Sequence, residues 1–92
     1  MISSQTFGAT DEWSNATTKQ IAPNTVVHDH SHPFNVRAIV TAGDITLTVL
    51  GEARTYRFGD VFTMTAGCVH HEQIGLDGVE YRVVRTDPST EP

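Results

Sequence analysis

The sequence has one cysteine, few basic residues and no long apolar run, and each shortage excludes a class of protein. Cys68 has no second cysteine to pair with, so an internal disulfide framework is excluded, and one thiolate cannot make a zinc site by itself. Any metal must therefore be held mainly by nitrogen and oxygen. Six Lys and Arg against eleven Asp and Glu leave a net charge of −5 and no basic stripe, so we expect no nucleic-acid partner.

Membrane insertion and secretion are not indicated either. No stretch approaches the roughly 18 apolar residues of a transmembrane helix. The start, MISSQTFGATDEW, lacks both the basic and the apolar region of a secretion signal. We expect no membrane partner and a cytoplasmic location. The 92 residues make one domain, and a chain of this size has only a modest core, which favours self-association.

Alternating apolar and polar residues from Val26 onward indicate antiparallel strands. The clearest hairpin covers residues 44–58, where DITLTVL and ARTYRF meet at a turn predicted at Gly51 and Glu52. Short strands at close spacing predict an all-β sandwich or barrel in a single domain.

Other turns divide the rest of the chain. Gly59-Asp60 leads into the strand VFTM, and a further strand pair is predicted from HHEQI through the turn GLDG to VEYRVVR, residues 70–85. Pro23-Asn24 suits the centre of a tight turn, because Pro presets φ and Asn tolerates positive φ.

Three of the five histidines stand in VVHDHSHPF, at positions 28, 30 and 32. In a strand, residues two apart lie on one face about 6.5 to 7 Å apart, so two imidazoles can converge on one ion. A chain rich in histidine produces such a pair by chance often enough that the spacing alone is a weak signal.

Another histidine, His70, ends the segment GDVFTMTAGCVH, which resembles a motif of the cupin superfamily. That motif runs G, five residues, P-x-G, two residues, H, three residues, N. Gly59, Gly67 and His70 stand at its intervals. Thr65 replaces the usual Pro, and Ile74 replaces the usual Asn.

The histidine-rich stretch resembles the other cupin motif, which runs G, five residues, H-x-H, three or four residues, E, six residues, G. His30 and His32 are the pair whose spacing brings Gly43 to the closing glycine. Asn24 replaces the leading Gly, and both residues accept positive φ. His28 is left over, either as a histidine at the pocket rim or in solvent, or as a further ligand.

The resemblance implies a double-stranded β-helix, or jelly-roll barrel, that forms a homodimer. It also implies one divalent metal ion per chain on His30, His32 and His70, and the choice among Fe, Zn, Ni, Mn and Cu stays open. The barrel would occupy residues 24–85, after an N-terminal segment, 1–23, that serves as an edge strand or dimer arm. Residues 86–92 would be a disordered tail.

The glutamate of the motif is missing, since Val36 and Arg37 stand at its two allowed positions. Three neutral imidazoles leave an ion at its full charge with open positions, which resembles the three-histidine iron centres of some cupin dioxygenases. Glu72, two residues beyond His70, is either a rival fourth ligand or a solvated glutamate. His28 is the other candidate.

Four further residues are candidates for a substrate pocket: Phe34, Val36, Arg37 and Cys68. Parity from His32 puts Val36 inside, but Pro33 can mark a bulge that resets the parity. Arg37 therefore either clamps a substrate carboxylate or lies on the outside. Cys68 is either a packing or a pocket residue.

Two functions follow, from different classes. One is a mononuclear metal enzyme, a non-haem oxygenase or dioxygenase that acts on a small organic molecule. The other is a non-catalytic barrel that binds a small ligand or metal and has a sensory role, as in some regulators with a cupin barrel. Fold alone decides neither.

Overall fold

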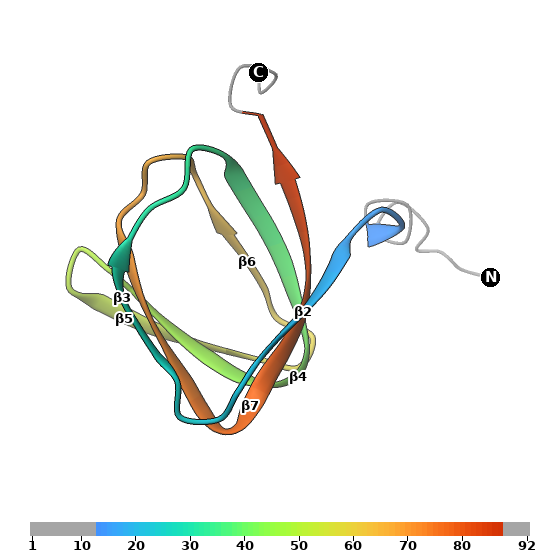
Figure 1. Cartoon of the computed structure of the whole chain (residues 1–92), viewed down its shortest axis with the longest axis vertical. Helices are drawn as coiled ribbons and strands as arrows, with labels where there is room; N and C mark the ends of the chain where they lie inside the picture. The colour runs from blue at the N-terminus through green and yellow to red at the C-terminus, as the bar shows by residue number, and fades with distance from the viewer. Residues whose placement is uncertain (1–12, 88–92) are drawn as a thin grey trace.

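The computed structural model describes residues 13–87 and folds them into six strands that curl around a common interior (Figure 1). In this part of the chain, no helix is long and apolar enough to cross a membrane. The strands are β2 (Thr17–Ile21), β3 (Val26–His30), β4 (Asn35–Val49), β5 (Glu52–Arg57), β6 (Val61–Met64) and β7 (His70–Thr86).

Two long strands, β4 and β7, form the centre of this architecture. They pair antiparallel along nearly their whole length, from Asn35 opposite Thr86 to Thr48 opposite His71. Strands β2 and β3 add to β7, whereas β5 and β6 add to β4. The predicted all-β jelly-roll barrel in one domain is confirmed.

The hairpin predicted through GLDG is wrong, because β7 continues through this segment as one bent strand. Both of its halves pair with β4, and the register shifts on each side of Gly43. Gly43 and Gly78 meet at the bend with φ of 71° and 76°, values that glycine adopts without strain. A Cβ on Gly43 would overlap the carbonyl oxygen of Gly78. The glycines therefore bend a pair of strands instead of reversing one.

The turn at Pro23-Asn24 is confirmed, with Asn24 at φ 61°. The loop between β4 and β5 lies one residue earlier than predicted. Leu50 and Gly51 form it, both at positive φ, because Glu52 already pairs with Val49. Two residues at positive φ match the twist of the hairpin that they join.

Alternation along the strands places one set of apolar side chains inside. The buried core consists of Ala38, Val40, Ile45, Leu47, Phe62, Met64, Ile74, Val79 and Tyr81. Among the described residues, His70 is the buried polar side chain, with 2% of its surface exposed. A buried imidazole needs partners for its ring nitrogens, which directs attention to its surroundings.

The predicted N-terminal segment contributes β2, which pairs with Val79–Val83 of β7. Residues 1–12 of that segment and 88–92 of the predicted tail lie outside the described part of the chain. The boundary at residue 23 and the homodimer stay predictions.

The substitution Gly43→Ala should destabilise the protein strongly, since it adds a backbone clash to the cost of positive φ. Gly51→Ala is the matched control, because Gly51 has φ 80° but no atom within 4 Å of an added Cβ. We expect a loss of about 1 kcal/mol for Gly51→Ala and at least about 3 kcal/mol for Gly43→Ala in urea unfolding. Equal losses would contradict the close approach of the two strands.

Candidate metal centre

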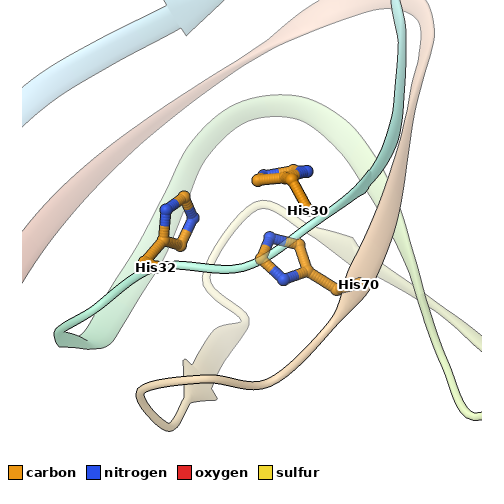
Figure 2. Close-up of side chains that lie close together, drawn as sticks. All are labelled: His30, His32 and His70. Carbon is orange, nitrogen blue, oxygen red and sulfur yellow. The ribbon is translucent and has the colours of Figure 1, made fainter.

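Three imidazoles converge from two strands and the segment that connects β3 to β4. His30 ends β3, His32 follows in this connecting segment, and His70 begins β7. Figure 2 shows the three rings close together, tilted relative to one another. One ligand nitrogen from each ring lies within 4.8 Å of the others. The ring centres of His30 and His70 are 4.1 Å apart.

A bulge in β3 selects which histidines turn inward. Val27 pairs with Glu72 and His30 pairs with His70, so the register shifts between them. The extra residue lets Val27 and His30 both face the interior and leaves His28 exposed on the outer surface. His28 packs against His71, with ring centres 5.8 Å apart. His28 therefore lies apart from the cluster of His30, His32 and His70.

Backbone carbonyls define the orientation of two rings. The Nδ1 of His30 lies 2.9 Å from the carbonyl oxygen of His28, and the Nδ1 of His70 lies 3.0 Å from that of Cys68. A carbonyl only accepts, so we assign the proton to Nδ1 in both rings. Their Nε2 atoms then carry lone pairs, as in the outer-shell support that metal-binding histidines use.

Glu72 lies between these two rings and is not a solvated glutamate. Its Oε2 is 3.3 Å from the Nε2 of His30 and 3.3 Å from the Nε2 of His70, and the side chain is 12% exposed. With both imidazoles protonated at Nδ1, the two Nε2 atoms and the Oε2 of Glu72 direct lone pairs toward one another. Such a group needs a cation, either a proton or a metal ion.

Burial lowers the pKa of His32 below its usual value, and the neighbouring His70 and His30 lower it further. Glu72 opposes this shift, whereas Lys19 adds to it. A lowered pKa keeps the imidazole neutral, which is the form that binds metal.

A cavity of about 340 Å³ opens next to the histidines. Phe34 and Val36, two of the residues considered for a substrate pocket, line it. Arg37 is exposed on the opposite face of β4, because residues next to each other in a strand point to opposite sides. Cys68 is not among the lining residues; its side chain packs against the core and its carbonyl holds His70.

The sequence analysis missed two basic residues that line the cavity, Lys19 and Arg85. Arg85 shares the parity of Tyr81 and Val83, so alternation in VEYRVVR was the available signal. Lys19 had no such signal, because its place opposite Tyr81 depends on the pairing of β2 with β7.

The donor set fits a divalent transition metal. Three imidazole nitrogens and one carboxylate oxygen are the ligand types that Zn, Mn, Fe, Ni and Cu accept. The three histidines of the predicted ligand set thus lie together, and Glu72 joins His30 and His70.

Comparison with known proteins gives a consistent result on the fold. No protein-family model and no curated protein matches the chain. A protein of unknown function from Rhizobium leguminosarum superposes with a TM-score of 0.74, at 18% identity over 78% of this chain and 68% of that one.

Two further solved structures with this architecture are a cupin protein and an oxalate decarboxylase. A cupin protein from Bacteroides fragilis superposes with a TM-score of 0.66, at 15% identity over 84% of this chain and 68% of that one. Oxalate decarboxylase from Bacillus subtilis, described with Mn(II) centres, gives 0.69 at 22% identity over 83% of this chain. This chain spans only 22% of that enzyme. The strand order, the converging histidines and these matches together show that the protein has the cupin fold.

Proposed function

We propose that the protein binds one divalent metal ion through His30, His32 and His70, with Glu72 as the fourth ligand. The observation that carries this proposal is the meeting of two Nε2 atoms and one carboxylate oxygen at 3.3 Å. Both imidazoles have their Nδ1 on a backbone carbonyl. A metal ion satisfies all these lone pairs at once.

We further propose that the site is catalytic, as a mononuclear oxygenase or dioxygenase that acts on a small organic molecule. A bound ion would supply Lewis acidity and, if it is redox-active, electron transfer. The apolar wall of the cavity would exclude water and seat the substrate, and 340 Å³ suits a small molecule. Support also comes from the Mn(II) centres described for a protein of the same fold.

The alternative is a non-catalytic barrel that binds a small ligand or metal and has a sensory role. One observation favours it: the residues that line the cavity offer few groups to accept a proton. Burial, assisted by Glu72 and opposed by Arg85, raises the pKa of Tyr81 to about 12, so this phenol stays protonated at neutral pH. Glu72 is engaged with two imidazoles.

Metal content measured by elemental mass spectrometry tests the centre. We expect about one equivalent per chain in the untagged parent and less than about a tenth of that in His32→Ala and His70→Ala. His28→Ala is the matched control and should keep the parent content, because its side chain faces outward. Glu72→Gln removes a ligand charge and should bind the same ion at least about tenfold more weakly in competition with a chelator, because loss of an outer-shell partner alone has an effect of this size. A parent that stays free of metal after reconstitution would overturn the proposal.

Oxygen uptake separates the enzyme from the sensor. Protein loaded with Fe(II) should consume O₂ in the presence of at least one member of a panel of diketones, phenols, thiols and small acids, and His70→Ala should not. Binding of a panel member without O₂ uptake would support the sensory alternative instead.

A further inference from the structure

The pocket differs in charge from the rest of the molecule. The chain carries a net charge of −5. Leaving the histidines aside, three charged residues line the cavity, and two of them are basic. These are Lys19 and Arg85, and the acidic one is Glu72. Since Glu72 faces His30 and His70, the two cations are the charges available to a ligand.

The two cations lie on the same face of the sheet, and both line the cavity. Lys19 lies on β2 directly opposite Tyr81 of β7. Arg85 stands four residues beyond Tyr81, on the same face of β7, with Val83 between them. Tyr81 is buried, whereas the side chains of Lys19 and Arg85 are exposed. The cavity is therefore apolar toward the core and basic at its mouth.

Arg85 is oriented by an aromatic ring. Its guanidinium carbon lies 4.6 Å from the centre of the Phe34 ring, and Phe34 in turn stacks on His32 at 5.1 Å with an interplanar angle of 10°. A guanidinium that lies over a ring keeps its edge N–H donors available to a planar anion such as a carboxylate. This stack links Arg85 to a histidine of the metal centre.

Lys19 is the second cation of this cavity, which His30, His32 and His70 also line. A ligand in the cavity therefore experiences the field of the Lys19 ammonium as well as that of the Arg85 guanidinium. Two positive groups at one opening favour an anion, and the field at a partly enclosed mouth is stronger than on an open surface.

The inner wall defines the rest of the ligand. Toward the core, the cavity is lined by aliphatic side chains that offer no hydrogen bonds, including those of Ile21, Val27, Val36, Leu47 and Val83. A ligand that fits this cavity has an apolar body and one anionic end.

We propose that the pocket takes a small monocarboxylate whose carboxylate is held at the mouth by Arg85 and Lys19 and whose apolar body lies against the inner wall. This inference rests on the proposed function, because a carboxylate bound in this pocket can be a substrate only if the neighbouring site holds a metal ion. Arg85 and Lys19 would bind the substrate carboxylate, which is the role considered for Arg37 from the sequence.

Benzoate and its neutral counterpart benzamide test this assignment. Binding is followed by NMR titration of zinc-loaded protein whose metal content is counted in the same sample. We expect benzoate to bind more tightly than benzamide, and Arg85→Gln and Lys19→Gln each to weaken benzoate binding about tenfold. Arg37→Gln removes the same charge outside the pocket and should change benzoate binding less than twofold. Both pocket side chains are exposed, so these variants should retain the parent's circular dichroism spectrum.

The outcomes separate the inference from the proposed function. With zinc present, equal binding of benzoate by the parent, Arg85→Gln and Lys19→Gln would overturn the carboxylate assignment and leave the metal site standing. An effect of Arg37→Gln as large as that of Arg85→Gln would overturn it too, since the cause would be net charge alone. A parent that binds no zinc would overturn the proposed function and the inference with it.

Discussion

The antiparallel pairing of β4 with β7 is the interaction on which the site depends. Every other described strand adds to one of these two. The pair bends where Gly43 meets Gly78, and this bend lets one strand serve two purposes. Before the bend, β7 carries His70 and Glu72; after it, β7 carries Tyr81 and Arg85. Two residues of the candidate metal centre, His70 and Glu72, and a basic group that lines the cavity, Arg85, are thus placed by a single strand that curves around the interior.

The chemistry of the centre is controlled by main-chain atoms. Two carbonyls accept hydrogen bonds from the Nδ1 atoms of His30 and His70 and leave both Nε2 atoms facing Glu72. The bulge in β3 is what allows His30 to face inward next to an outward His28. In a regular strand, His28 and His30 would lie on the same face, because residues two apart point to the same side. The centre is therefore built by backbone irregularities as much as by the histidines themselves.

Much of this arrangement was predictable from the sequence. Period-two alternation identified the strands of the hairpin at 44–58, and the spacing of two motifs identified His30, His32 and His70. These signals are local or depend on fixed intervals. Parity favoured Val36 inside, and Val36 lines the cavity because Pro33 precedes β4 and does not interrupt its alternation. The turn at Pro23-Asn24 followed from the backbone preferences of its two residues.

What escaped prediction depends on strand pairing over long sequence separations. Two glycines in GLDG signal a change of direction, but only the pairing with β4 shows that the strand bends instead of reversing. Lys19 reaches the cavity through a register with a strand some 60 residues away. The sequence made Glu72 a candidate, but its position between two imidazoles depends on where His30 lies on another strand.

The most direct test of the central claim is the state of the imidazole nitrogens, measured by long-range ¹H–¹⁵N NMR before and after zinc is added. The account predicts that His30 and His70 carry their proton on Nδ1 and that zinc shifts their Nε2 resonances while those of His28 stay unchanged. Protons on Nε2, or Nε2 resonances that zinc leaves unmoved, would contradict it.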